Sequence, residues 1–179
     1  PQSHRLGVEL QGRYKLTKAW QVSGNLTLSE NKIKNFSDYI PHYDASFNLA
    51  KQDTAYYKNP DLAFSPAVVG SGLVTVFPFS NAEIDLISKY TGKQYLDNTS
   101  SSTKQINGYF AQDLRLQYSF HNKGLKEITL VAQMSNIWDR KYESNGYTYS
   151  YIYDQSLVKE NFYFPMAGRN FMIALNIKM

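Results

Sequence analysis

The sequence predicts an all-β fold, an antiparallel up-and-down sheet that forms part of a transmembrane β-barrel. Apolar and polar residues alternate along about seven segments, each of roughly ten residues or more, the length that crosses a bilayer at a tilt. Short and long connections follow one another in turn. Aromatic residues collect near the segment ends, where membrane interfaces favour them.

The first two segments show the clearest alternation. Residues 5–16 carry an apolar side chain or glycine at every second position, and residues 20–29 repeat the pattern after the short turn Thr17–Ala19. This period of two predicts the two strands of a hairpin. The alternation is lost from Glu30 to Pro60, where we expect a loop of roughly thirty residues. In a compact soluble domain a loop of that length would count against the assignment unless the loop is functional.

Four further strands are expected before the last one. They are predicted over residues 61–76, 82–90, 110–120 and 127–137, with short turns at 77–80 and 121–126. Long polar connections are expected at 92–106 and 138–167. Within the second of these, Asn145–Gly146 predicts the turn of a hairpin.

The final segment, Gly168–Met179, ends the chain as an amphipathic strand. Its apolar residues are Phe171, Ile173, Leu175, Ile177 and Met179, and we expect them to face lipid. The apolar faces of all the predicted strands lack charge, and a lysine or arginine near the bilayer midplane would cost about 2–4 kcal/mol there. A soluble sandwich would also alternate, but its strands are usually shorter and its connections more even.

An odd number of strands predicts an incomplete barrel. Bacterial barrels have an even number of strands, from about eight upward, so we expect residues 1–179 to supply one portion of a larger barrel. Both edges of the resulting sheet would then lack a partner in this chain.

The residue types argue against catalysis and bound cofactors. The absence of cysteine excludes disulfides and thiolate metal sites, and His4, His42 and His121 lack the spacing of metal ligands. Glu83 and Asp85 share a strand face, but a polar lining explains them better than a catalytic pair. We therefore expect no enzyme, no metal and no cofactor.

Two other expectations concern charge. Asp113 and Arg115 also share a strand face and are expected to pair with each other. The formal charge of +4 is spread along the chain, so nucleic acid is not an expected partner.

Two segments near the C-terminus carry a family resemblance. Asn136–Tyr142 resembles the Asn-Leu-Phe-Asp-Lys-x-Tyr segment near the end of TonB-dependent outer-membrane receptors, and Ala167–Phe171 resembles the segment that opens their final strand. Residues 93–99, 145–147 and 162–165 are similar to long-looped members. The resemblance covers nearly the whole chain, but Met179 stands where such barrels usually end in phenylalanine.

The resemblance implies the C-terminal portion of a barrel of about 22 strands. The plug and the earlier strands would lie outside these residues, in the outer membrane of a Gram-negative bacterium. Such a receptor imports an iron chelate, a cobalamin or a glycan fragment, with energy relayed by TonB through the plug. The implied partners are the rest of the receptor, TonB, outer-membrane lipid and a surface lipoprotein.

The last long connection contains the candidate ligand-binding residues. Tyr147, Tyr149, Tyr151 and Tyr153 alternate, so an extended segment would turn all four rings the same way, and Trp138 begins the same connection. A tyrosine offers a flat apolar ring with a polar tip, suited to a sugar or a chelate. The rings would alternatively pack the loop against its neighbours.

A second function class stays open at this point. The chain would alternatively be a soluble all-β carbohydrate-binding or adhesion module with tyrosine-rich loops. A receptor segment needs detergent or the rest of its barrel, whereas such a module is monomeric in plain buffer.

Overall fold

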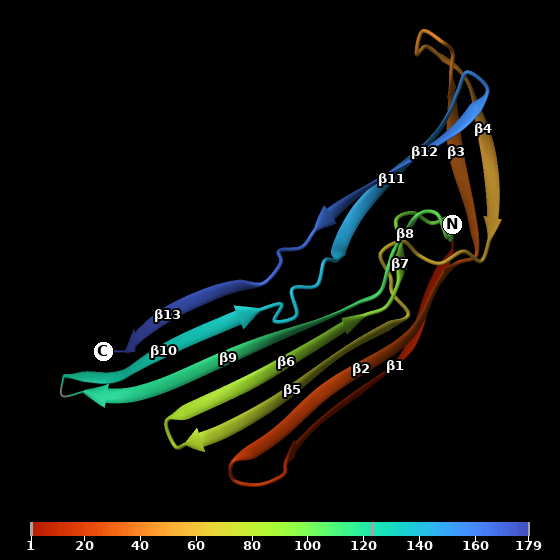
Figure 1. Cartoon of the computed structure of the whole chain (residues 1–179). Helices are drawn as coiled ribbons and strands as arrows, with labels where there is room; N and C mark the ends of the chain where they lie inside the picture. Colours follow the sequence, from red (N-terminus) through yellow and green to blue (C-terminus); the bar gives the residue numbers. More distant parts are fainter. Residues whose placement is uncertain (1, 123, 179) are drawn as a thin grey trace.

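Seven long strands form one antiparallel sheet in the computed structural model of the chain, which describes residues 2–122 and 124–178 (Figure 1). In spatial order they are β1 (Ser3–Lys15), β2 (Trp20–Ile33), β5 (Val68–Phe79), β6 (Ala82–Thr91), β9 (Tyr109–Asn122), β10 (Leu125–Ser135) and β13 (Asn170–Lys178). The seven predicted strands are confirmed. The sheet does not close on itself, and β1 and β13 form its two edges.

The strand register gathers the apolar side chains on one face. Val22 lies opposite Val74, Val74 opposite Leu86, and Leu86 opposite Leu114, which continues the same row across four strands. Polar side chains such as those of Ser71, Asp85 and Arg115 occupy the other face, because successive residues of a strand point to opposite sides.

The apolar face is uncovered. In β13 the exposed fractions of Phe171, Ile173, Leu175 and Ile177 are 69%, 77%, 58% and 52%, so no second sheet of the described chain packs on them. Met179 lies outside the described residues. An apolar surface of this extent calls for lipid or another apolar partner.

The connection from Glu30 to Pro60 is not the predicted loop. Strand β2 continues to Ile33, and a hairpin follows, made of β3 (Asn35–Tyr43) and β4 (Leu49–Lys58). The prediction was wrong because aromatic and polar residues occur on both faces of these strands, which hides the period of two.

The third predicted strand begins later than expected. Residues 61–67 are irregular, and β5 starts at Val68. Phe64 has a φ of 51°, which interrupts an extended backbone, and Pro66 lacks an amide hydrogen for a strand ladder. The ends of β10 and β13 lie within two residues of their predicted positions.

Asn145–Gly146 does not form the predicted turn. Both residues lie inside β11 (Glu143–Tyr153), which pairs with β12 (Ser156–Pro165) across the two-residue turn Asp154–Gln155. The φ angles of these two turn residues are 43° and 62°, as a type I′ hairpin requires. Gly146 is needed instead because the two strands approach each other closely there. A Cβ at this position would lie 2.5 Å from the Phe162 carbonyl oxygen.

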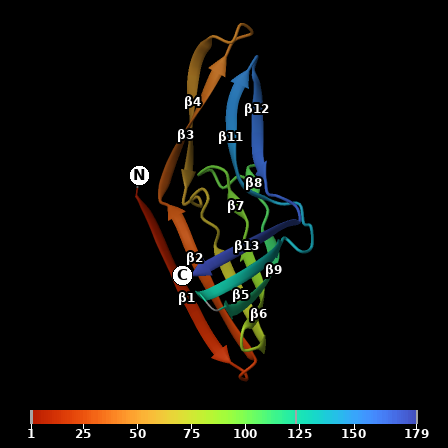
Figure 2. The ribbon, with the colours of Figure 1, turned by 90° about the vertical axis from the view of Figure 1, so that its left-hand side faces the viewer.

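The long connections build a second sheet beyond one end of the first. Its strand order is β12-β11-β3-β4, and both views show its two hairpins projecting from the end of the large sheet opposite the short turns (Figures 1 and 2). A third connection carries the short strands β7 (Gln94–Tyr95) and β8 (Gln105–Ile106).

Buried apolar side chains gather where these long connections begin. Ile33, Leu96 and Ile106 are 6%, 5% and 1% exposed. These three buried side chains lie close in sequence to the points where the long connections leave the large sheet. Within residues 2–122 and 124–178, no helix has the length and apolar character needed to span a membrane.

Candidate functional site

The β11–β12 hairpin carries the predicted tyrosines, and its extended backbone confirms their alternation along one strand. The rings divide into two groups. Tyr147 stacks on Phe162 with ring centroids 4.9 Å apart and also contacts Tyr149. Tyr151 and Tyr153 turn toward the other hairpin instead. The hairpin therefore uses its tyrosines both for internal packing and for contact with β3–β4.

The tip of the β3–β4 hairpin is held by Asp44. Its carboxylate accepts hydrogen bonds from the backbone amides of Ser46 (2.8 Å) and Asn48 (2.9 Å). These bonds, that from Asn48 foremost, lower the pKa of Asp44 below its ordinary value. The turn places Phe47 at a φ of 59°, a conformation that costs a bulky residue free energy. Such strain is typical of functional sites.

The two hairpins meet at their tips. Strands β3 and β11 pair in parallel over only two residue pairs, Ile152 with His42 and Tyr153 with Tyr43. The Phe47 ring stacks on Tyr153 at 4.6 Å, which explains what the strained turn accomplishes. The Tyr153 hydroxyl also donates to the Ala45 carbonyl oxygen at 3.2 Å.

Below the joined tips, β3 and β11 separate around a hollow of about 460 Å³. Its lining residues come from both hairpins: Asp38, Tyr39, Pro41, Tyr43, Phe47, Thr148, Tyr149, Ser150 and Tyr151. A concave, largely aromatic surface with a few polar groups is typical of a small-molecule site. The Ser150 hydroxyl oxygen is buried and has no hydrogen-bond partner among the described residues.

The hollow only partly matches the sequence prediction. Tyr149 and Tyr151 line it, whereas Tyr147 and Tyr153 do not. Sequence reasoning missed Tyr39, Tyr43 and Phe47 because they lie in the segment predicted to be a loop. The alternation of Tyr39, Pro41 and Tyr43 was the available signal.

An ion pair lies on β3–β4 beside the hollow. His42, with 14% of its side chain exposed, lies 2.6 Å from the Asp53 carboxylate, and Lys51 lies 3.4 Å from the same carboxylate. The hydrogen bond to His42 foremost, and the Lys51 ammonium nearby, lower the pKa of Asp53 below its ordinary value. The Asp53 carboxylate therefore has two partners, the His42 ring and the Lys51 ammonium group.

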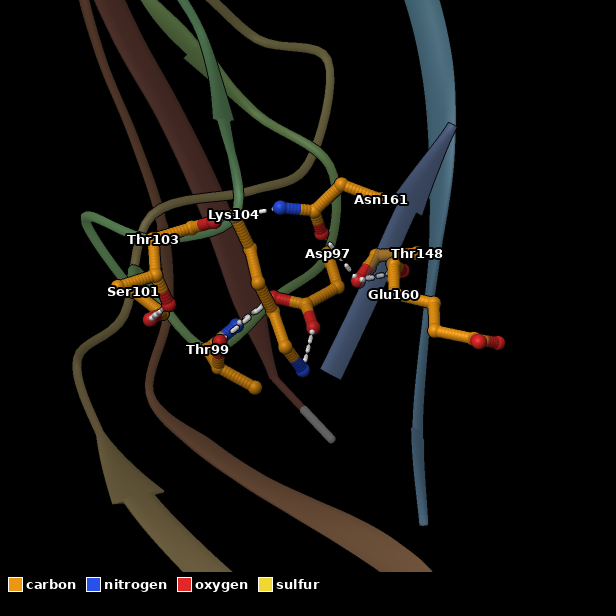
Figure 3. A network of polar contacts seen from close by, with 8 residues as sticks. All are labelled: Asp97, Thr99, Ser101, Thr103, Lys104, Thr148, Glu160 and Asn161. Atoms are coloured by element: carbon orange, nitrogen blue, oxygen red, sulfur yellow. Dashed lines mark hydrogen bonds and ion pairs between the residues drawn. The ribbon is translucent and has the colours of Figure 1, made fainter. Parts of the chain in front are cut away.

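The β11–β12 hairpin is braced by the connection between β6 and β9 (Figure 3). Lys104, with 7% of its side chain exposed, pairs with Asp97 at 2.7 Å and holds that connection in shape. The side-chain amide of Asn161 donates to the Thr103 carbonyl oxygen at 2.7 Å, and the Thr148 hydroxyl donates to the Asn161 side chain at 2.8 Å. These bonds fix the β11 side of the hollow.

Trp138 lies apart from the hollow. It occupies the turn after β10, its side chain is 62% exposed, and its indole N–H donates to the Gln112 side chain at 2.6 Å. Gln112 in turn donates to the Ser88 hydroxyl at 2.8 Å. The structure thus does not bring Trp138 together with the predicted tyrosines around the hollow.

The two C-terminal segments that carry the family resemblance contact each other. The buried Asn136 side chain donates to the carbonyl oxygens of Arg140 (2.9 Å) and Ala167 (3.2 Å). The Asp139 carboxylate accepts a hydrogen bond from the Arg169 amide at 2.8 Å, which is the main reason that the pKa of Asp139 lies below its ordinary value. These contacts hold the start of β13 next to the end of β10.

The polar face of the large sheet holds a second charged cluster. Arg115 on β9 pairs with Asp85 on β6 at 2.6 Å, and the Thr75 hydroxyl donates to Asp85 at 2.7 Å. Asp85 is 1% exposed. The expected pairing of Arg115 with Asp113 is wrong, because the Asp113 carboxylate instead accepts the Asn136 amide at 2.9 Å.

Comparison with known proteins identifies relatives in fold. No family model and no curated protein matches the sequence. Among solved structures, the siderophore receptor PiuA from Acinetobacter baumannii matches with a TM-score of 0.70 and 16% identity, covering 99% of this chain and 22% of that one. The ferric yersiniabactin uptake receptor FyuA from Yersinia pestis matches with a TM-score of 0.63 and 16% identity, covering 99% and 24%.

A third solved structure agrees with these two. The ferric-catecholate import receptor Fiu from E. coli K12, in its open form, matches with a TM-score of 0.61 and 16% identity, covering 99% and 21%. At such identities the likeness shows the fold alone. The chain therefore has the fold of a segment of these receptors and spans less than a quarter of their length.

Proposed function

We propose that this chain is the C-terminal wall and outer loops of a TonB-dependent receptor that imports a scarce nutrient across the outer membrane of a Gram-negative bacterium. In this arrangement the apolar face of the large sheet contacts lipid, and its polar face lines the barrel interior. The missing strands of a barrel of about 22 pair with the free edges of β1 and β13, and a plug outside these residues contacts TonB.

The observation that carries the proposal is the exposed, uncharged apolar face combined with one-sided loops. A soluble binding module would leave Phe171, Ile173 and Leu175 in water, each more than half exposed. In a bilayer the same residues are favourably placed. The receptor interpretation therefore accounts for a surface that the soluble carbohydrate-binding alternative leaves unexplained.

We propose that the nutrient is an iron chelate and that the hollow between the two hairpins contributes to its capture. The fold neighbours are receptors for siderophores and ferric chelates by their names, which favours this nutrient over cobalamin or a glycan. The aromatic lining suits a ligand with flat or apolar parts.

Binding by the full-length receptor tests the proposal. The purified protein in detergent is titrated with ferric catecholate, hydroxamate and carboxylate chelates, and with cobalamin and oligosaccharides. Uptake of radiolabelled iron is then followed in cells with and without TonB. We expect one ferric chelate class to bind, with uptake only where TonB is present. Binding of oligosaccharides alone, by a protein that is monomeric without detergent, would overturn the proposal.

A tyrosine variant tests the hollow itself. Replacing both Tyr149 and Tyr151 with alanine removes two ring contacts, each worth about 0.5–1.5 kcal/mol, so the affinity should fall about 5- to 150-fold. Tyr56→Ala is the matched control, because Tyr56 belongs to the same sheet, is 81% exposed and does not line the hollow. Equal affinities for both variants would exclude the hollow as the capture site.

A further inference from the structure

A groove on the polar face of the large sheet carries cations and no carboxylate. It has a volume of about 340 Å³, and we call it the basic groove. Polar side chains from five strands line it: Arg13 on β1, Ser23 and Asn25 on β2, Ser71 on β5, Lys89 on β6 and Arg115 on β9. No aspartate or glutamate of the described chain is among its lining residues. The side chains that line the groove therefore carry only positive charge.

The strand register places these side chains on one face of the sheet. Arg13 lies opposite Ser23, and the neighbouring row runs from Asn25 through Ser71 to Lys89. Directly paired residues of adjacent strands point to the same side of a sheet, as do residues two positions apart in one strand. Because Asn25 follows Ser23 by two positions, both rows lie on the same face, the polar face to which Ser71 belongs.

Long side chains flank short ones across the basic groove. Arg13 and Lys89 stand on the first and fourth strands of the sheet, whose backbones are about 14 Å apart at the usual strand spacing. Ser23, Asn25 and Ser71 lie on the two strands between them and have short side chains. The groove thus has a cation on each side and a floor of small polar groups.

The third cation of the groove already has a partner, whereas the other two do not. Arg115 donates two hydrogen bonds to the Asp85 carboxylate, from Nε at 3.0 Å and from Nη2 at 2.6 Å. The side chains of Arg13 and Lys89 are exposed, and neither forms an ion pair within residues 2–122 and 124–178. Two positive charges on this face therefore lack a carboxylate partner in the described part of the chain.

The surroundings of the polar face decide what these two charges require. In water an exposed lysine or arginine needs no partner, so a soluble module would leave the basic groove empty. Inside a barrel that a plug fills, the same side chains would lose part of their hydration. A charge removed from water costs free energy unless an opposite charge lies beside it. The surface that complements this groove is therefore acidic.

We propose that the basic groove is a docking site for the plug, which contacts it through an acidic segment with carboxylates beside Arg13 and Lys89. This inference rests on the proposed function and adds to it the place and the charge of one contact between plug and wall. The hydroxyl groups of Ser23 and Ser71 and the amide of Asn25 supply hydrogen-bonding groups for that segment on the groove floor.

Carbodiimide coupling tests the contact on the full-length receptor. The reagent joins a lysine amine to a carboxylate that touches it, and peptide mass spectrometry identifies the two residues. We expect Lys89 to be coupled to an aspartate or glutamate of the plug. Lys32 and Asp61, whose charged atoms lie 2.6 Å apart, are the internal control for the reaction. Lys89→Arg keeps the positive charge but lacks the amine, so it should lose this one crosslink alone.

Release of the plug tests what the contact contributes. Cleavage of the plug by added protease tracks the population of its released state when release and redocking are fast. Because a hydrogen bond between charged groups is lost, Arg13→Ala and Lys89→Ala should each accelerate cleavage roughly 10- to 150-fold. Lys89→Arg should change the rate little. Lys18→Ala is the matched control, since it removes an exposed cation from the turn after β1, outside the groove, and should leave the rate unchanged.

The outcomes separate the two proposals. This inference alone would be overturned if Lys89 stays uncoupled while Lys32 reacts, if Lys89 couples only to a carboxylate of the barrel, or if Lys89→Ala and Lys18→Ala give the same cleavage rate. A full-length protein that has no plug and imports no ferric chelate would instead refute the proposed function, and the inference with it.

Discussion

Leu175→Lys tests whether the apolar face contacts lipid. Leu175 lies in β13 opposite Leu130 of β10, in the interior of the apolar row, and is 58% exposed. A lysine near the bilayer midplane of a barrel costs about 2–4 kcal/mol, which lowers the folding equilibrium constant about 30- to 1,000-fold. The flexible lysine stem reaches toward the interface, so we expect a value near the lower end of this range.

The next residue provides the control. Asn176 is also exposed but lies on the polar face, so Asn176→Lys should change stability by no more than about 0.5 kcal/mol. Both full-length variants are folded into lipid vesicles over a urea series, and the folded fraction is measured from the gel mobility of unheated samples. Equal urea midpoints for the two variants would refute the assignment of this face to lipid, because a soluble sheet tolerates both changes alike.

Three further predictions concern the structural contacts. Asp85→Asn removes the carboxylate that lies 2.6 Å from Arg115 and leaves Glu83, at 4.0 Å, as the nearer remaining one, so it should destabilise the full-length protein by roughly 2–3 kcal/mol in urea unfolding, less than for a fully buried pair because the guanidinium is partly exposed; an unchanged midpoint would contradict the role of this pair. Gly146→Ala places a Cβ 2.5 Å from a backbone oxygen and should cost about 1–3 kcal/mol, whereas Gly12→Ala, with nothing within 4 Å, should cost little. Because the pKa of Asp139 is lowered in the folded state, its contribution to stability is present above the ordinary value of about 3.9 and is lost as pH falls through the folded pKa. Hydrogen exchange of the amide bonded to Asp139, corrected for its intrinsic rate, should accelerate only in that acid range, and uniform protection would contradict this.

The large sheet was predictable because each of its strands has one apolar and one polar face. Leu10, Leu26 and Leu114 each have polar neighbours on both sides in the sequence, and the period of two identifies such strands directly. The hairpin β3–β4 lacks this contrast. Its residues meet other loops and solvent rather than a uniform apolar medium, so no single face is selected for hydrophobicity.

The turn of β11–β12 shows a different limit. Asn145–Gly146 has the composition of a hairpin turn, but Gly146 is needed where the Phe162 carbonyl and Leu96 approach closely. A sequence does not distinguish a glycine required for its backbone angles from one required for space. The actual turn uses Asp154 and Gln155, the second of which is a weak signal.

The hollow was half predictable for a related reason. Alternation along one strand identified Tyr149 and Tyr151. Tyr39 and Tyr43 come from a strand more than one hundred residues earlier, and the two strands pair over only two residue pairs. A contact of two residue pairs between strands so far apart in the sequence leaves no pattern in either strand from which it could be predicted.

The joined hairpin tips act as a clasp over the hollow. The contacts described there comprise two aromatic pairs, the Tyr153 hydroxyl bond and the bond from the Asp154 amide to the Tyr43 carbonyl oxygen. At about 0.5–1.5 kcal/mol each, they sum to roughly 2–6 kcal/mol, far less than is needed to unzip either hairpin. We therefore expect the tip contacts to break more readily than either hairpin unfolds, so that a ligand which binds the hollow with the tips joined would favour the joined state.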